Sequence, residues 1–395
     1  MKKILLGTTG LIGAALLAGI ANAETPKVTL GGFADVQAGY TSDDFDDNQN
    51  AIGFRNENTV TLHVDGKTAG GLGYGAVIDL EADVSEDEDD QGFNASRTFT
   101  YLSGNWGRVE LGSVESSAAT MRVDASRLAV ATGGINGSWV DFVNPGAAGT
   151  TNGQGFISTS KLSAEHGLVD APGNESTANA SKINYYSPQF SGFQLGASYT
   201  PNLQGRGQEL GRQEKFASVA NGLVQQNVFN AGVSYDNQFD NGLRLAAAAT
   251  GEWGSAAEAT SAVAPNDAYQ DISAWNAGAL LGFHGFSLAG SYGDWGDSGQ
   301  LKGAARGGDA HYWTLGAGYE TGPVGLSVTY MDSEYEQASN ASGSNDVSNI
   351  VVGADYKLAP GLTPYAEVSF YDLDSSGTTY DNQGTTVLVG TQVAF

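Results

Sequence analysis

The segment VTLGGFADVQAGY (Val28–Tyr40) alternates apolar and polar side chains along its length. One parity carries Val28, Leu30, Ala34, Val36 and Tyr40, and the other carries Asp35 and Gln37. A period of two residues predicts a β-strand with one apolar face, because successive side chains of a strand point to opposite sides.

Similar segments recur along the whole chain. They include Ala51–Asp65, Leu72–Asp83, Phe93–Ser103, Arg108–Ser113, Lys182–Ser187, Phe193–Thr200 and Thr385–Phe395. Short turns alternate with long polar loops, and the pattern gives about sixteen strands, seven short turns and eight long loops. It predicts an all-β, antiparallel up-and-down β-barrel that spans a membrane, with both termini on the short-turn side.

A soluble β-sandwich or a large sugar-binding β protein is the alternative to a membrane barrel. A sandwich needs two apolar inner faces, but the second face of these strands carries mainly Thr, Gly, Ser, Asn and Gln. Lipid cannot satisfy an open sheet edge, so a spanning sheet must close. We place five tyrosines near the long-loop ends of their strands, as an interfacial girdle: Tyr40, Tyr199, Tyr235, Tyr292 and Tyr330.

The first 23 residues are typical of a signal peptide. Lys2 and Lys3 precede a mostly apolar stretch, Ile4–Ile20, and Ala21–Ala23 is a small-residue cleavage site. A membrane anchor is the other interpretation of this stretch. Residues 24–395 form a single domain in our prediction, without disulfides because the sequence has no cysteine. The formal net charge of −26 argues against nucleic acid as a partner.

The alternation disappears between Gly112 and Ser181, where Gly, Ala, Ser and Asn dominate. A compact domain seldom carries a structureless insertion of this length unless the insertion is functional. We therefore expect this stretch to fold into the mouth of the barrel.

Three stretches resemble the Gram-negative general diffusion porins, closest to the alphaproteobacterial type. They are NWGRVELGS (Asn105–Ser113), NYYSPQFSGFQLGASYT (Asn184–Thr200) and the last strand, which ends at Phe395. The resemblance implies a homotrimer of sixteen-stranded barrels in the outer membrane of a Gram-negative bacterium, in contact with lipid and lipopolysaccharide. It also implies that a long third loop, within residues 113–181, folds inward and forms a constriction. We expect only its first half to line this constriction, with the rest packing elsewhere.

In the constriction that the resemblance implies, loop carboxylates face basic residues of the wall. The acidic candidates are Glu115, Asp124 and Asp141, with Arg122 and Arg127 between them. Charged rings in a narrow, low-dielectric pore set ion selectivity. The alternative is that these Arg–Asp pairs only hold the loop against the wall.

The basic candidates on the wall are Arg55, Arg97 and Arg108. Arg55 is the strongest, because it lies on the second strand with lumen parity. Arg97 shares its parity with Phe99 and Tyr101, which we expect to face lipid, so Arg97 is expected at the rim. Arg108 lies beside a short turn and is expected below the constriction.

Metal and enzyme sites have weak signals. The acidic segments 43–47 (DDFDD) and 83–90 (DVSEDEDD) are candidates for Ca²⁺, or for divalent bridges to lipopolysaccharide, although neither has ordered ligand spacing. Residues 372–383 begin like an EF-hand loop but end in Gln383. Solvated loop charge is the simpler interpretation of all three. The four histidines have no zinc spacing, and the sequence contains no Gly-x-Ser-x-Gly motif.

The sequence thus predicts a passive channel for small hydrophilic solutes and ions, with a mild cation preference and no enzymatic activity or cofactor. A substrate-selective porin and a structural or adhesive barrel with a closed lumen remain the alternatives. An outer-membrane lipase-like enzyme would require a lipid-facing Ser–His pair.

Overall fold

The computed structural model describes residues 25–45, 50–82, 94–143, 156–166, 179–203, 205, 207, 224–257, 270–300, 302, 308–336, 344–375 and 381–395. The predicted signal peptide (1–23) and the acidic segment 83–90 lie outside the described residues, as do parts of the segments 43–47 and 372–383.

The described residues form sixteen strands and five short helical segments. The strands are β1 (Lys27–Asp43), β2 (Ile52–Lys67), β3 (Gly73–Glu81), β4 (Asn94–Gly104), β5 (Gly107–Ser113), β6 (Ser181–Tyr186), β7 (Phe193–Asn202), β8 (Val224–Gln238), β9 (Arg244–Ala257), β10 (Ile272–Phe283), β11 (Phe286–Asp294), β12 (Ala310–Thr321), β13 (Val324–Glu336), β14 (Ser344–Tyr356), β15 (Leu362–Ser375) and β16 (Asn382–Ala394). The helical segments are α1 (Ser117–Met121), η1 (Ala125–Leu128), η2 (Gly134–Asn136), η3 (Ser138–Phe142) and α2 (Ser163–His166).

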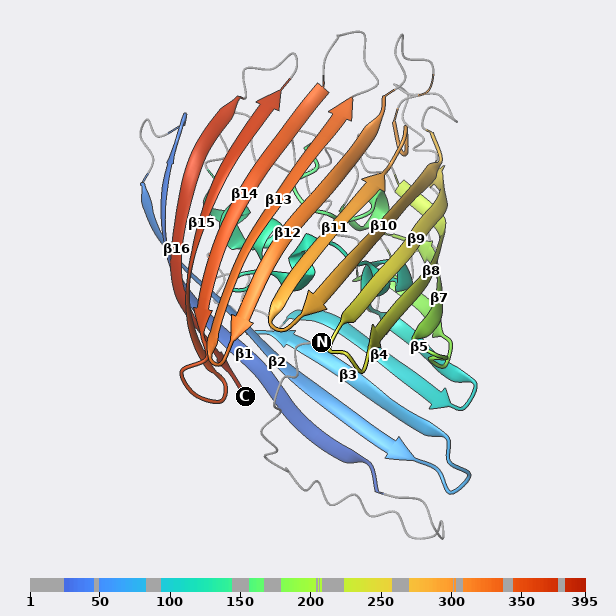
Figure 1. Cartoon of the computed structure of the whole chain (residues 1–395). Helices are drawn as coiled ribbons and strands as arrows, with labels where there is room; N and C mark the ends of the chain where they lie inside the picture. The colour runs from blue at the N-terminus through green and yellow to red at the C-terminus, as the bar shows by residue number, and fades with distance from the viewer. Residues whose placement is uncertain are drawn as a thin grey trace.

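Each strand pairs with its neighbours in sequence, and β16 pairs with β1 to close the barrel (Figure 1). At this seam, the amide nitrogen of Gly32 lies 3.0 Å from the carbonyl oxygen of Phe395, and the reverse bond measures 3.1 Å. Closure leaves no strand edge unpaired, which a sheet surrounded by lipid requires. The predicted up-and-down barrel of about sixteen strands is confirmed.

Short turns gather at one end of the barrel and long connections at the other, as Figure 1 shows. The β10–β11 connection consists of two residues, His284 and Gly285, and both have positive φ (49° and 87°). A type I′ turn requires this geometry, and its twist matches that of the flanking strands. The side chain of His284 packs against Phe283, with ring centroids 4.2 Å apart.

The two faces of the barrel are the reverse of those of a soluble domain. Large apolar side chains are exposed on the outside, with Phe54 82% exposed, whereas Asn276 and Thr329 are fully buried on the lumen side. This polarity supports lipid outside and a polar interior, and it excludes the sandwich alternative. Among the described residues, no helix is long and apolar enough to cross a membrane.

Aromatic pairs lie toward both ends of the outer surface. Tyr199–Phe229, Trp275–Tyr292 and Trp313–Tyr330 lie toward the long loops, whereas Phe193–Tyr235 and Phe286–Tyr319 lie beside short turns. The prediction that Tyr235 lies near a long loop is therefore wrong. Strand β8 runs toward the short turn that precedes β9, and Tyr235 is near that end.

The five helical segments all belong to the connection between β5 and β6, and they lie inside the ring of strands (Figure 1). We call this connection the inward loop (114–180). The described residues of this loop lie in the lumen, as predicted, and they form an apolar core there with Tyr312 of β12 and with Trp295, which directly follows β11.

Candidate functional site

The first part of the inward loop follows the inner wall. Segment α1 packs against β7, β8 and β9, η1 against β11 to β13, and η2 against β13 and β14. Segment η3 reaches β16 and β1. The helical segments therefore follow the wall from β7 round to β1, while Val114, at the start of the loop, packs on Val77 of β3 and Phe99 of β4.

Wall hydroxyls hold the loop by accepting hydrogen bonds from its backbone amides. The bonds run from Ser117 N to Ser198 Oγ (2.6 Å), from Ala125 N to Thr314 Oγ1 (3.2 Å), from Val130 N to Ser327 Oγ (3.1 Å) and from Ile135 N to Thr329 Oγ1 (3.1 Å). Irregular backbone at membrane depth is tolerated only where its polar groups are satisfied in this way. The small polar residues that face the lumen thus form hydrogen bonds with the loop backbone, in addition to providing a polar surface for water.

The second part of the loop, 156–166, packs between the first part and the wall. The Tyr312 hydroxyl donates to the Ser160 carbonyl (2.9 Å), the Ser333 hydroxyl to the Ile157 carbonyl (2.8 Å) and the Trp295 indole to the Lys161 carbonyl (3.0 Å). Ile157 and Leu162 join the same apolar core as Ile135. This part of the loop stabilises the position of the first.

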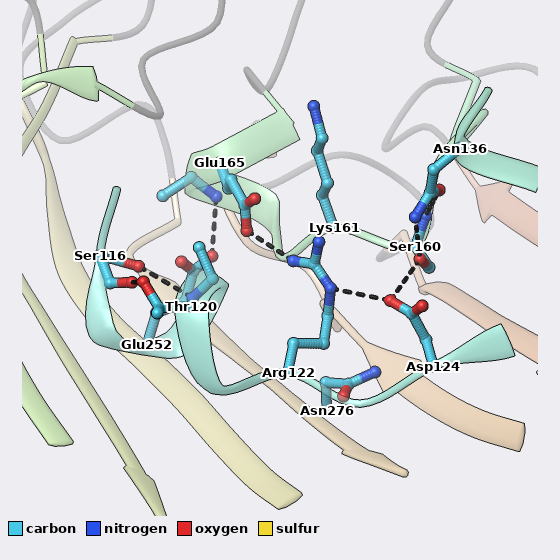
Figure 2. Close-up of polar contacts among 12 residues, drawn as sticks. Ser116, Thr120, Arg122, Asp124, Asn136, Ser160, Lys161, Glu165, Glu252 and Asn276 are labelled. Atoms are coloured by element: carbon cyan, nitrogen blue, oxygen red, sulfur yellow. Dashed lines mark hydrogen bonds and ion pairs between the residues drawn. The ribbon is translucent and has the colours of Figure 1, made fainter. Parts of the chain in front are cut away.

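A buried ion cluster joins the two parts of the loop, as Figure 2 shows. Arg122 lies 3.0 Å from Asp124 and 2.7 Å from Glu165, and Ser160 donates to Asp124 at 2.8 Å. Burial alone would raise the pKa of Asp124, but the Arg122 charge and the hydroxyls of Ser126 and Ser160 more than offset it and lower that pKa. Burial would lower the pKa of Arg122, and the two carboxylates reverse that effect. Both groups are therefore held in their charged forms.

Two ionisable wall residues form hydrogen bonds with other parts of the loop. Glu252 on β9 accepts from the Ser163 hydroxyl (2.6 Å) and from the Ala164 amide (2.7 Å), at the start of α2. The Lys182 ammonium on β6 donates to the carbonyls of Val114 and Ala180 (the latter at 2.8 Å), so it contacts both ends of the inward loop.

The β2 side of the lumen is more accessible to solvent than the wall under the helical segments of the loop. On β2 the lumen-facing residues Arg55, Glu57, Thr59, Thr61 and His63 are half-buried. Under the loop, lumen-facing residues such as Asn276 on β10 and Thr329 on β13 are fully buried. This difference in exposure makes the space between the loop and the β2 side of the barrel the candidate passage.

Arg55 and Asp141 meet beside this passage. Their Nη2 and Oδ2 atoms lie 3.4 Å apart, and the side chains are 33% and 41% exposed. Arg55 also pairs with Glu57 at 3.1 Å and donates to Ser138 at 3.4 Å. Burial raises the pKa of Asp141, and the Arg55 charge opposes that shift.

Arg97 faces the lumen where the loop leaves the wall. It pairs with Asp79 on β3 at 2.6 Å, and its neighbour Thr98 is opposite Ser113, the last residue of β5. The expectation that Phe99 faces lipid is wrong, because Phe99 is buried in a lumen cluster with Val77 and Val114. Because β4 has apolar residues on both faces, its sequence does not show which face is directed into the lumen. The contact between Phe99 and Val114 of the loop identifies the lumen face.

Glu115 is exposed just beyond the end of β5, and its backbone carbonyl accepts from Asn184 at 2.8 Å. Asp124, by contrast, is only 2% exposed, so its carboxylate is held inside the loop and not in the passage. The ion pair with Arg122 allows the Asp124 carboxylate to be buried, whereas Glu115 does not pair with Arg122.

Arg108 lies beside the short turn, as expected. It pairs with Glu110 at 2.7 Å and lies over the ring of Tyr101 at 3.8 Å. This contact also places Tyr101 on the lumen side, so its predicted lipid-facing orientation is wrong. Arg108 lines a cavity of about 550 Å³ on the short-turn side of the loop, together with Arg127.

The sequence model of one protein family, described as Gram-negative porin, matches residues 8–376 of this chain. The chain belongs to the Gram-negative porin family. Uncharacterized proteins of Rickettsia felis and Rickettsia typhi are each 27% identical to this porin, over alignments of 458 and 463 residues that span all of both chains.

Solved porins share the fold of this porin. An anion-selective porin from Comamonas acidovorans has a TM-score of 0.63 at 20% identity, and the match covers 94% of this chain and 100% of that one. OmpT of Vibrio cholerae, in its trimer form, has a TM-score of 0.59 at 12% identity, with the same coverage. Family and fold together indicate an outer-membrane diffusion channel.

Arg127 is a residue of this porin that sequence reasoning did not select for the constriction. Its guanidinium is exposed and donates to the carbonyls of Thr120 (3.1 Å) and Arg122 (2.6 Å). It lines both the 550 Å³ cavity and a second cavity of about 770 Å³ that reaches the short turns. Partial loss of water around the guanidinium inside the lumen, together with repulsion from Arg122 and Arg244, lowers the pKa of Arg127 despite the nearby Asp124 and Asp236. The only sequence signal was its position among the loop acids.

Within the part of this porin that the structure describes, no group of three or more His, Cys, Asp or Glu residues could hold a metal ion. The acidic segment 83–90 lies outside that part, and Ca²⁺ binding there stays a prediction.

Proposed function

We propose that this porin is a passive channel for small hydrophilic solutes and ions, with a mild cation preference and no enzymatic activity. The observation that carries the proposal is the uneven exposure of the lumen. The inward loop buries the wall from β7 to β16, while the charged residues of β2 keep contact with solvent. Solutes would pass between Arg55 and Glu57 on β2 and the edge of the loop.

The charges along this passage support the cation preference. We assign three exposed or half-exposed acids to it, namely Glu57, Glu115 and Asp141, and two arginines, Arg55 and Arg97. Asp79 offsets Arg97 through a 2.6 Å ion pair. A local excess of acid in a low-dielectric opening raises the concentration of cations there.

The proposed working form is a homotrimer in the outer membrane, in contact with lipopolysaccharide, after cleavage of the signal peptide following Ala23. A related fold from Vibrio cholerae is described in trimer form, which supports the oligomer. The acidic segments 43–47 and 83–90 are proposed to bind divalent ions that bridge them to lipid phosphates.

Single-channel recording of the purified full chain in a planar bilayer tests the function. We expect large, stable conductance steps in groups of three, with a reversal potential under a salt gradient that mildly favours cations. The absence of steps would indicate a closed structural barrel. Block by one sugar or one anion would indicate a substrate-selective porin.

Two variants test the proposed passage. Arg55→Ala removes a positive charge from the wall, so the reversal potential should move toward greater cation preference. Glu115→Ala removes a negative charge from the loop side, and the shift should be opposite. Equal reversal potentials in both variants would place the passage elsewhere.

A further inference from the structure

Glycines of the inner wall lie directly beneath the inward loop. Met121 of the loop packs over Gly196 on β7 and Gly232 on β8, which face each other in the strand register. A Cβ atom on Gly196 would overlap the Met121 sulfur and lie 3.0 Å from the Ser117 Cβ, and one on Gly232 would lie 3.2 Å from that sulfur. A side chain at either position would occupy space that the loop fills.

The same arrangement recurs at the other end of the loop's first part. The ring of Phe142 packs over Gly39 on β1 and Gly53 on β2, which are also opposite each other in register. A Cβ on Gly39 would overlap this ring, and one on Gly53 would lie 3.5 Å from it. Phe142 follows directly after Asp141, so this contact fixes the loop beside the proposed passage.

Further glycines lie between these two ends. A Cβ on Gly278 would overlap the Val123 carbonyl of the loop. A Cβ on Gly316 would lie 3.1 Å from Ala125, and one on Gly318 would lie 3.3 Å from Leu128. Val130 would lie 2.9 Å from a Cβ on Gly325 and 3.3 Å from one on Gly353. Wall glycines therefore contact the loop at several points between Met121 and Val130, and again at Phe142.

Backbone conformation does not account for these glycines. The left-handed φ values occur at other glycines, such as Gly285 and Gly361 in turns, and not at Gly39, Gly196 or Gly278. Glycine in a strand interior is destabilising relative to alanine and often marks a site where another backbone approaches closely. Space for the loop is the property that these positions share.

We infer that these glycines set the distance between the inward loop and the wall, and through it the width of the passage. The inference rests on the proposed function for its effect on permeation. A side chain at a glycine beneath the loop lifts the loop off the wall of β7 to β14. The loop then moves into the lumen, toward β2, and the passage narrows.

Gly196 is the best position for a test, because the two nearest atoms to its built Cβ both belong to the loop. Gly278 is less suitable, since its Cβ would also lie 2.8 Å from Ser291 of the neighbouring strand. Gly282 on β10 is the matched control, because a Cβ there makes ordinary contacts at 3.5 Å and 3.7 Å with Arg244 and Ser287 and meets no loop atom. Gly196→Ala and Gly196→Val should lower the single-channel conductance progressively, and Gly282→Ala and Gly282→Val should not.

Removing the loop side chain should restore the passage. Met121→Ala removes the nearer of the two loop contacts over Gly196 and leaves the one with Ser117, so Gly196→Ala should lower the conductance less in that background than in the wild-type protein. A general loss of barrel stability would persist in the double variant. This non-additivity distinguishes loop position from a weakened fold.

Loop position can also be measured without conduction. The chain has no cysteine, and the Ser117 amide lies 2.6 Å from the Ser198 hydroxyl, so Ser117→Cys with Ser198→Cys should form a disulfide on mild oxidation. Gly196→Val should slow its formation, and Gly282→Val should not. If the folded Gly196→Val protein keeps both the wild-type cross-linking rate and the wild-type conductance, the inference is overturned. If the wild-type protein does not conduct, the proposed function fails, while the cross-linking rate still decides whether glycine positions the loop.

Discussion

Arg55 on β2 and Asp141 on the inward loop form an ion pair across the edge of the proposed passage, with 3.4 Å between Nη2 and Oδ2. The pair joins the end of the loop's first part to β2, whose lumen-facing residues are half-buried. Both side chains remain partly exposed, so each contributes charge to the passage as well as to the position of the loop.

Asp141→Asn should shift the reversal potential toward anions, because it removes a loop carboxylate and leaves Arg55 with Glu57 alone. The barrel should lose little stability, within about 1 kcal/mol, since partly exposed ion pairs contribute little. Reversal potential and denaturant unfolding of one preparation check both points. Asp240→Asn, in the exposed turn between β8 and β9, is the control and should leave both unchanged.

Arg122→Ala should loosen the inward loop. The substitution leaves the carboxylates of Asp124 and Glu165 buried without their cation, and breaking a buried ion pair costs about 3–5 kcal/mol. We expect noisy, fluctuating conductance and faster proteolysis within the loop. Arg244→Ala breaks an exposed pair with Asp236 (2.8 Å) and should cost about 0–1 kcal/mol. Equal protease resistance of the two variants would contradict a stabilising role for the cluster.

Acidification should act in two steps. The pKa of Asp141 is raised, mainly by burial, so this group takes up a proton above the usual aspartate value of about 3.9. The reversal potential should therefore move toward anions first, while the loop is still in place. Asp141→Asn should abolish this first step.

The second step follows from Asp124, whose pKa is lowered because Arg122 and two hydroxyls outweigh the effect of burial. A carboxyl group with a lowered folded-state pKa stabilises the fold above its unfolded pKa, about 3.9, and that stabilisation is lost as the pH falls through the folded value. Pepsin cleavage of the loop should therefore rise only below about pH 4. In the Asp124→Asn variant, which has no carboxyl group to protonate at this position, the rate of loop cleavage should not show this rise below about pH 4.

Lys182→Met should release both ends of the inward loop. The ammonium donates to the carbonyls of Val114 and Ala180, and each buried acceptor left without a donor costs about 1–3 kcal/mol. We expect a lower midpoint of thermal unfolding and faster cleavage near the loop ends. Lys357→Met is a suitable control, because Lys357 is exposed and lies 3.4 Å from Glu320. Identical midpoints for the two variants would exclude the clamp.

Much of the barrel could be predicted because its signals are local. The alternation of apolar and polar residues in β1 and β16 indicates which residues face lipid. The alternation of short and long connections indicates an up-and-down topology. The exceptions have local causes. Val77 and Phe99 are apolar on the lumen parity because the inward loop covers them, and Tyr235 was assigned to the wrong end of its strand.

The candidate site was less predictable, because its charges are sorted by contacts between distant residues. The sequence presents Glu115, Asp124 and Asp141 as three equivalent loop acids. In the folded protein, Glu115 is exposed, Asp124 is buried with Arg122, and Asp141 pairs with Arg55, 86 residues before it in the chain. The hydroxyl of Thr132 likewise bonds to Glu367, 235 residues away, which no spacing rule indicates.

The sequence by itself determined that this chain closes into a barrel with an inward loop. Lipid leaves a polar backbone no alternative to a closed sheet, and a period of two records which face meets the lipid. Only the tertiary structure decided which charges face the passage and how far the loop extends into it. The position of the loop depends on the space left by the missing side chains at Gly39 and Gly196. The charge of the passage depends on the burial of Asp124 beside Arg122. Both conditions arise only when strands that are distant in sequence enclose the loop.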